Sequence, residues 1–530
     1  MHDSEPRRRF TFLTKCLGAG ALIGVANLLF YGESAGATLG GFALAWLAVL
    51  AATRPDLRRH SAARLALLAA AGFALAMVDD PGALDLWLFW IALTSASVLP
   101  QHCYTDAIGW CGKLALHALV GIVAPLRDLR RWMKAGRAGK GRTLAAVSGL
   151  LLLPVGGSVV FLALFASANP LIGNAFATIE LPDLSSAILH LLFWSAVLLL
   201  VWPSLRPRFQ MIRIEPSSET NGHSFGVPVA TATLSLVAFN AIFAIENLLD
   251  LAFLWSGAPL PTGVTMADYA HRGAYPLIAT ALLAGVFVLV AAIPGTPAAH
   301  SRTVRRLIVL WVGQNLLLVA SSILRTIDYV AAYSLTVLRL EALAWMALVG
   351  VGLVLIVWRM LAGRSVQWLI NANAVAAGAV LVAASVLDLG ATTASWNVRH
   401  ARTAGDLDLC YIEELGASAL LPLVELERRA GGPVLRDRSA YLRSQAMYRV
   451  EADQADWHSW TWRNARRLTA ARGLLGDTPP RVRDVYQGRA CGGAPLPPDP
   501  DLVAPSDPAA SAIDRVERTS AAPLTRRAQP

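Results

Sequence analysis

Long apolar runs separated by short basic stretches follow one another along most of the chain. Each run has about 17–25 mostly apolar residues, the length that a helix needs to cross the hydrocarbon core of a membrane. The pattern predicts an all-α fold: a polytopic α-helical membrane protein with about 11 transmembrane helices. These helices are expected at residues 13–31, 36–53, 63–79, 84–100, 143–166, 187–203, 228–254, 274–293, 306–323, 335–358 and 366–387, which together form a transmembrane bundle over 13–387.

One stretch, residues 101–126, fits this pattern poorly. Its apolar part is only about a dozen residues long, which is too short to cross a membrane. We therefore predict a re-entrant or interfacial segment here. If it did cross, one of its neighbours could not.

The chain changes character near residue 388. From there to about 490, charges of both signs appear with ordinary helical periodicity, which predicts a small, mainly helical domain outside the membrane. Residues 491–530 are rich in Pro, Ala, Ser and Asp, and we expect a disordered tail.

The composition agrees with an integral membrane protein. Hydrophobic residues make up 55% of the chain and charged residues 15%, and the mean hydropathy is +0.49, outside the usual range of soluble proteins. The net charge of +10 lies largely in short loops such as "RPDLRRH", "RDLRRWMKAGRAGKGR" and "RTVRR". Because these basic runs alternate with apolar runs and lack interleaved aromatic residues, we do not expect nucleic acid as a partner.

The basic loops also predict an orientation. The positive-inside rule assigns them, and the N-terminal residues 1–12, to the cytoplasm. An odd number of helices then places the C-terminal domain on the extracytoplasmic side. The start of the chain also resembles an export signal, but the same pattern of basic and then apolar residues recurs, so we favour an uncleaved first helix. The expected location is the bacterial cytoplasmic (inner) membrane.

The five cysteines predict no framework of disulfides. Cys410 and Cys491, which lie in the predicted outer domain, are a disulfide candidate in an oxidising compartment. Cys103 and Cys111 lie near two histidines, but their spacing matches no zinc pattern, and we predict no metal site there. The sequence also lacks the common nucleotide-binding, metalloprotease and hydrolase motifs, and we predict no cofactor.

Charged residues within the predicted helices are the candidate functional residues, because each costs about 2.5–3.5 kcal/mol to insert in a membrane. The predicted helix 228–254 contains "ENLLDLAFLW", in which Glu246 and Asp250 are four residues apart and share a helix face. Later segments are expected to bring further polar groups to the same depth. The candidate polar site comprises Glu246, Asn247, Asp250, Asp268, Tyr269, His271, Arg272, Asn315, Arg325, Asp328, Arg339 and Glu341.

This set has two interpretations. It is a structural network in which arginines and carboxylates neutralise one another and hold helices together, or it is an outward-facing site that takes up protons, binds a ligand or performs acid–base chemistry.

The stretches "ENLLDLAFLWSGAPLPTGVTMADYAHRGAYPLIATALLAG", "RTIDYVAAYSLTVLRLEALAWM" and "ATTASWNVRHARTAGDLDLCYIEELG" resemble the bacterial multispan membrane family named domain of unknown function 4173, which is related to domain of unknown function 4153. The resemblance covers roughly residues 140–430. It implies that the outer loop and the "ENLLD" helix form one unit with an attached outer domain, and it implies no catalytic residues.

Three functional hypotheses remain open, and whether the chain is an enzyme is uncertain. The first is transport of an ion or small solute, and the second is an enzyme acting on a lipid-linked or cell-envelope substrate. The third is a non-catalytic membrane sensor or assembly protein. The expected partners are the lipid bilayer and a possible lipid-linked or small-molecule ligand, while protein partners are unknown.

Overall fold

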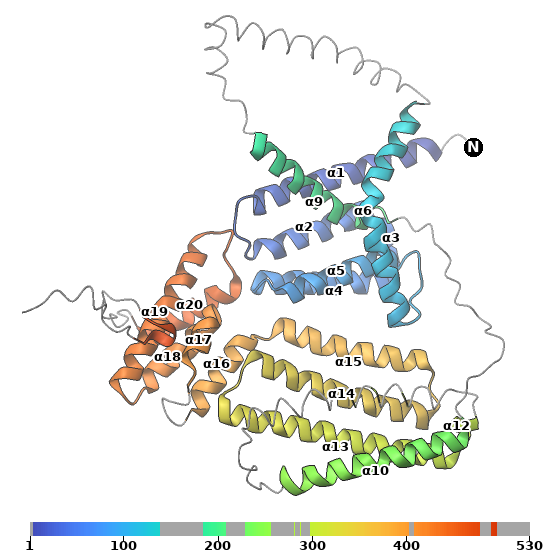
Figure 1. Ribbon diagram of the computed structural model, residues 1–530. Coiled ribbons are helices and arrows are strands. Elements are labelled where there is room, and N and C mark those ends of the chain that lie inside the picture. Colours follow the sequence, from blue (N-terminus) through green and yellow to red (C-terminus); the bar gives the residue numbers. More distant parts are fainter. Residues whose placement is uncertain are drawn as a thin grey trace, which may run out of the picture. The chain divides into compact units, whose positions relative to one another are not determined.

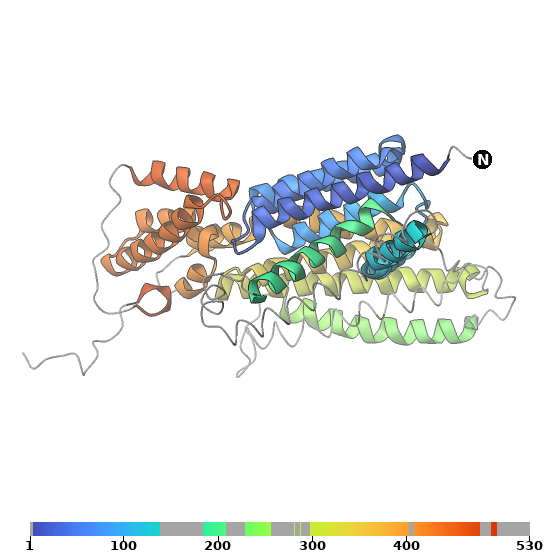
Figure 2. The ribbon, with the colours of Figure 1, turned by 90° about the horizontal axis from the view of Figure 1, so that it is seen from above.

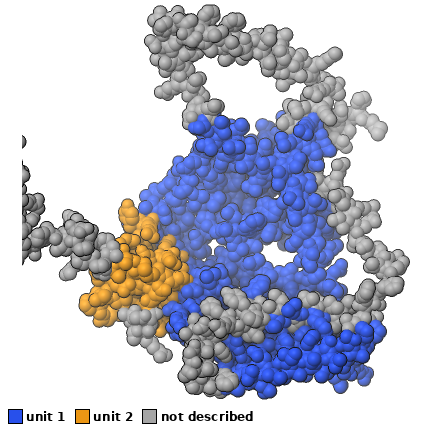
Figure 3. Space-filling model, viewed as in Figure 1, with its two compact units in different colours: residues 1–393, 450–469 blue, residues 394–449, 470–530 orange. Residues whose placement is uncertain are grey.

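The computed structural model of the protein describes residues 4–137, 184–207, 228–255, 280, 283, 287, 297–401, 407–476 and 489–494. Within these residues all regular secondary structure is helical, and no β-strand forms. This agrees with the predicted all-α class (Figure 1). The chain divides into two compact units, one of Met1–Thr393 with Val450–Thr469 and one of Ala394–Arg449 with Ala470–Pro530 (Figure 3).

The first part of unit 1 is a group of helices packed around an apolar core. Its helices are α1 (Ser4–Phe30), α2 (Thr38–Thr53), the short α3 (Pro55–Arg59), α4 (Ser61–Asp79), α5 (Ala83–Val98), α6 (Ala107–Arg137) and α9 (Leu184–Leu205). Leu22, Leu50 and Leu93 from three of these helices are buried in one cluster with Leu205 of α9. Burial of this apolar surface stabilises the packing of the helices in this part of the unit.

Arg54 links helices of this group at the end that carries the basic loop of residues 54–60. Its guanidinium donates to the backbone oxygens of Ser204 (2.9 Å) and Ser97 (3.2 Å), and it forms an ion pair with Asp56 (2.6 Å). These backbone oxygens lie at helix C-termini, where a cation is favourable.

The later part of unit 1 contains α10 (Val229–Phe253), the short α12 (Pro297–His300), α13 (Arg302–Tyr333), α14 (Val337–Ala362) and α15 (Val366–Val386). Both ribbon views show α10 beside α13 (Figures 1 and 2). The core between them contains Leu236, Ile308 and Trp311, with Leu353 contributed by α14.

Most of the predicted transmembrane helices have counterparts. Eight helices among the described residues are long and apolar enough to cross a membrane, and α2 and α5 are shorter apolar helices. The predicted helix 143–166 lies outside the described residues. Of the predicted helix 274–293, the described residues Thr280, Leu283 and Phe287 are helical.

The stretch predicted as re-entrant or interfacial, residues 101–126, belongs to a longer helix than its short apolar run suggested. It lies largely in α6, whose segment Ala107–Asp128 has 22 residues and is long and apolar enough for a membrane span. Asp106 accepts a hydrogen bond from the backbone N–H of Gly109 (2.7 Å), which is the geometry of a helix N-cap. The cap starts the helix several residues before the strongly apolar run.

Unit 2 consists of short helices. They are the later part of α16 (Leu389–His400), then α17 (Leu409–Glu414), η2 (Gly416–Ala419), α18 (Leu420–Arg429), the first part of α19 (Pro433–Ala455), the end of α20 (Trp462–Leu475) and η3 (Cys491–Gly493). A buried ion pair between Arg443 and Glu427 (2.8 Å) joins α19 to α18. Residues 450–469 of the predicted outer domain group with unit 1.

Candidate functional site

The contact between α10 and α13 contains a row of buried or partly buried polar side chains, which we call the polar seam. Its members are Asn240, Asn247 and Asp250 of α10 and Gln314, Ser321 and Arg325 of α13, and we include the buried Asn315 because it follows Gln314 directly. On α10 the members are seven and three residues apart, and on α13 Gln314, Ser321 and Arg325 are seven and four residues apart. Such spacings keep one stripe of each helix toward the other.

Hydrogen bonds in the seam show that the two helices run in the same direction. The Asn240 side chain donates to the backbone oxygen of Leu307 (3.2 Å), and the Asn247 side chain donates to the backbone oxygen of Gln314 (3.3 Å). The same offset of 67 residues separates both pairs. Gln314 Nε2 also donates to Asn240 Oδ1 (3.0 Å). Because partner numbers rise together, α10 and α13 are parallel.

The predicted topology also places these two helices parallel to each other. Two parallel membrane helices require the chain between them to cross back, and the predicted helix 274–293 lies between them in sequence. Phe287, a described residue of that segment, packs against Phe239 of α10 (5.2 Å between ring centroids) and Trp311 of α13 (5.5 Å).

The charged end of the seam is an ion pair between Asp250 and Arg325, which also hydrogen-bond to each other. The two side chains are only 4% and 8% exposed, respectively. Nearby, the indole N–H of Trp255 donates to Ser321 Oγ (3.2 Å). A paired carboxylate and guanidinium neutralise each other, as buried charges in a membrane must.

Several acceptors in the seam are nevertheless unsatisfied. Within the described residues, Asn247 Oδ1, Asp250 Oδ2, Gln314 Oε1 and Asn315 Oδ1 are buried and have no hydrogen-bond partner. A buried acceptor without a partner costs about 1–3 kcal/mol. All four atoms are oxygens, which are the ligands that hard cations prefer.

Four of the predicted residues that the structure describes do not join this row. Glu246 and Glu341 are exposed on α10 and α14. Arg339 donates to the backbone oxygen of Tyr333 (2.6 Å) at the end of α13 and lies over the ring of Tyr329 (4.2 Å). Asp328 is partly buried. The other predicted residues, Asp268, Tyr269, His271 and Arg272, lie outside the described residues.

A second polar cluster, which sequence reasoning missed, lies at one end of unit 1. We call it the arginine clamp, and it consists of Arg463, Arg466 and Arg467 of α20 with Asp79, Asp80 and Asp388. Arg463 pairs with Asp79 (2.8 Å) and Asp80 (3.0 Å), and Arg467 pairs with Asp388. The clamp joins the loop between α4 and α5 to the start of α16.

A backbone contact adjoins the clamp. The N–H of Gly36 donates to the oxygen of His458 (2.7 Å), and the N–H of Ala37 donates to the oxygen of Trp460 (2.7 Å). A Cβ at Gly36 would lie 2.5 Å from the carbonyl carbon of Ser459, so only glycine permits this approach. The loops involved are those predicted to share the Lys- and Arg-poor side of the membrane.

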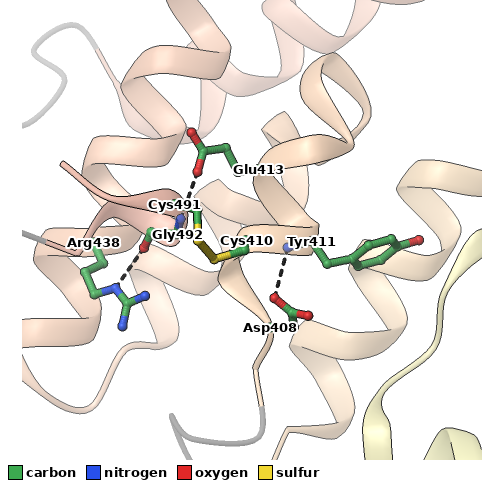
Figure 4. The surroundings of a disulfide bond; sticks show 7 residues. All are labelled: Asp408, Cys410, Tyr411, Glu413, Arg438, Cys491 and Gly492. Carbon is green, nitrogen blue, oxygen red and sulfur yellow. Dashed lines mark hydrogen bonds between the residues drawn. A yellow bond between two sulfur atoms is a disulfide. The ribbon is translucent and has the colours of Figure 1, made fainter.

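Unit 2 contains a disulfide between Cys410 and Cys491, the two cysteines named as a candidate pair (Figure 4). Gly492, which follows Cys491, donates its N–H to Glu413 (2.8 Å), and its oxygen accepts from Arg438 (2.8 Å). Gly492 has φ +68°, and a Cβ there would lie 2.9 Å from Leu409 Cβ. The disulfide is thus held in a closely packed site.

Comparison with known proteins gives one match. The family model described as Domain of unknown function (DUF4153) matches residues 17–426. No curated protein and no solved structure matches significantly. The matched family, domain of unknown function 4153, is the one that the sequence resemblance gave as a related family. Membership of domain of unknown function 4173 stays a prediction.

Proposed function

The chain belongs to the family described as Domain of unknown function (DUF4153), and we propose that this membrane protein passes a proton or monovalent cation along the polar seam. Asp250 carries the proposal: one oxygen of this carboxylate pairs with Arg325, and the other is buried with no partner among the residues that the structure describes. Ionisable groups inside a membrane commonly mark ion pathways.

The donor set of the seam favours a cation over an organic solute. Among the described residues, the amide oxygens of Asn247 and Asn315 are buried without a hydrogen-bond partner, and Asn247 lies one turn from Asp250 on α10. Carbonyl-type and carboxylate oxygens can replace the hydration shell of a small cation. Arg325 competes for the same carboxylate, so arrival of the cation weakens the ion pair between α10 and α13.

We further propose an orientation with the C-terminal domain on the extracytoplasmic side of a bacterial inner membrane. The distribution of basic loops supports it. The disulfide between Cys410 and Cys491 supports it independently, because such bonds persist in oxidising compartments and are rare in the cytosol.

The transport proposal is tested with purified protein in sealed vesicles. Gradients of H⁺, Na⁺ and K⁺ are imposed in turn, and ion flux is followed with internal dyes. We expect wild-type flux for one ion, at least tenfold less flux for Asp250→Asn, and unchanged flux for Glu246→Gln. Glu246 is the matched control, because it lies one turn away on α10 and is exposed.

Two results contradict the proposal. One is the absence of protein-dependent flux under all three gradients. The other is equal flux in wild type and Asp250→Asn, which would leave the seam a structural element.

A non-catalytic sensor or assembly protein is the second candidate, and the arginine clamp favours it. The arginines of the clamp belong to α20, which follows much of unit 2 in the sequence. They contact the ends of α4 and α15 and the neighbouring Asp388. Loss of a cellular phenotype in Arg463→Ala, with vesicle flux unchanged, would support this candidate.

A further inference from the structure

Three potential metal ligands meet beside the arginine clamp, away from the polar seam. They are Glu33 in the loop between α1 and α2, and Asp456 and His458 in the segment between α19 and α20. One ligand atom from each lies within 4.8 Å of the other two. The side chain of His458 is 12% exposed, whereas those of Glu33 and Asp456 are 45% and 43% exposed. A hydrated ion can therefore reach the carboxylates from solvent.

The separations suit a small, tetrahedral ion. His458 Nδ1 lies 3.1 Å from Asp456 Oδ1 and 3.6 Å from Glu33 Oε2. Ligands at about 2.0–2.2 Å from a tetrahedral Zn²⁺ are about 3.3–3.6 Å apart. The same imidazole nitrogen faces both carboxylates. Coordination through Nδ1 requires only that the ring proton reside on Nε2, the other neutral tautomer.

The surrounding backbone positions the ligands before an ion arrives. The N–H of His458 donates to Asp456 Oδ1 (3.0 Å), which fixes these two residues relative to each other. The oxygen of His458 accepts from the Gly36 N–H (2.7 Å) and from Thr38 Oγ1 (3.2 Å), which brings in the loop that carries Glu33.

We propose that Glu33, Asp456 and His458 bind one divalent transition-metal ion of the zinc class. One imidazole nitrogen and two carboxylate oxygens are suitable zinc ligands, and three protein ligands leave a fourth position for water. The ion joins the loop between α1 and α2 to the segment between α19 and α20. Its role is to hold this segment against the loop between α1 and α2 when the metal is present.

The test uses the untagged full-length protein in detergent, stripped of metal with a chelator and titrated with ZnSO₄ in a calorimeter. We expect one Zn²⁺ per chain, with affinity at least tenfold weaker in Glu33→Gln and in His458→Ala. Asp453→Asn is the matched control, because Asp453 is an exposed carboxylate in the last turn of α19, close in sequence to the group but outside it. Its affinity should equal that of wild type.

X-ray absorption of the zinc complex supplies a second readout that does not depend on folding of the variants. We expect a shell of nitrogen and oxygen with a single imidazole. Sulfur in the shell would assign the ion to the exposed thiols of Cys103 and Cys111 and overturn the proposal. Wild-type affinity in Glu33→Gln, or no zinc binding by the wild type, would also overturn it.

Discussion

Replacing Arg325 by Met should destabilise the protein far more than replacing both members of its ion pair. The Arg325 and Asp250 side chains are 8% and 4% exposed, so the single change leaves a carboxylate buried without its countercharge. Breaking a buried pair in this way costs about 3–5 kcal/mol. In Asp250→Leu with Arg325→Met the charge is gone, and so is the unpartnered oxygen of Asp250, which itself costs about 1–3 kcal/mol. We expect the double variant to match or exceed wild-type stability.

The assay is unfolding by increasing SDS in mixed micelles, followed by helical circular dichroism. Arg325→Met should unfold at a lower SDS fraction than wild type, and the double variant should recover the wild-type midpoint. If Arg325→Met unfolded like wild type, the pair would be accessible to water and the seam would not be buried. If the double variant were as unstable as the single variant, packing and not charge would dominate at this position.

Three further predictions concern contacts outside the seam. Arg467→Ala should lower the free energy of unfolding in SDS by about 1–3 kcal/mol, because the Arg467 side chain is 8% exposed and pairs with Asp388. Arg466→Ala should lower it by under about 0.5 kcal/mol, because the Arg466 side chain is 62% exposed. Cys410→Ser should lower the stability of unit 2 by up to about 4 kcal/mol, since the disulfide closes a loop of 81 residues, and reductant should reproduce this loss in wild type but not in the variant. Asn371→Ala should cost about 1–2 kcal/mol in the same unfolding assay, because this side chain makes three hydrogen bonds to residues 104–107.

The positions of the helices could be predicted well where hydropathy alone decides them. The predicted helix 366–387 corresponds to α15 (Val366–Val386), because the hydrocarbon thickness sets the length of an apolar helix. α13 extends ten residues beyond the predicted end at 323, to Tyr333. The additional turns contain Arg325 and Asp328, which lower the hydropathy of the sequence but do not interrupt the backbone hydrogen bonds of the helix.

The predicted polar site was resolved less well, and helix geometry explains why. The four-residue spacing of Glu246 and Asp250 suggested one shared face, yet Glu246 is exposed and Asp250 is buried. At about 100° per residue, Asn247 and Asp250 flank the direction toward α13, while Glu246 lies about 40° beyond Asp250. A single packing partner covers only part of the helix surface. Spacing can therefore group residues, but it does not show where the covered arc ends.

The arginine clamp marks the limit of sequence reasoning more sharply. Its ingredients are visible in the sequence: Asp79 and Asp80 end one apolar run, Asp388 follows another, and "WRNARR" offers arginines three and four residues apart. Complementary charges on one predicted side of the membrane would have suggested that these segments meet. They could not have assigned partners, because any of the three arginines can neutralise any of the aspartates. Which arginine pairs with which aspartate depends on helix packing. Packing places Arg463 between the end of α4 and the end of α15, and it places Arg467 beside Asp388.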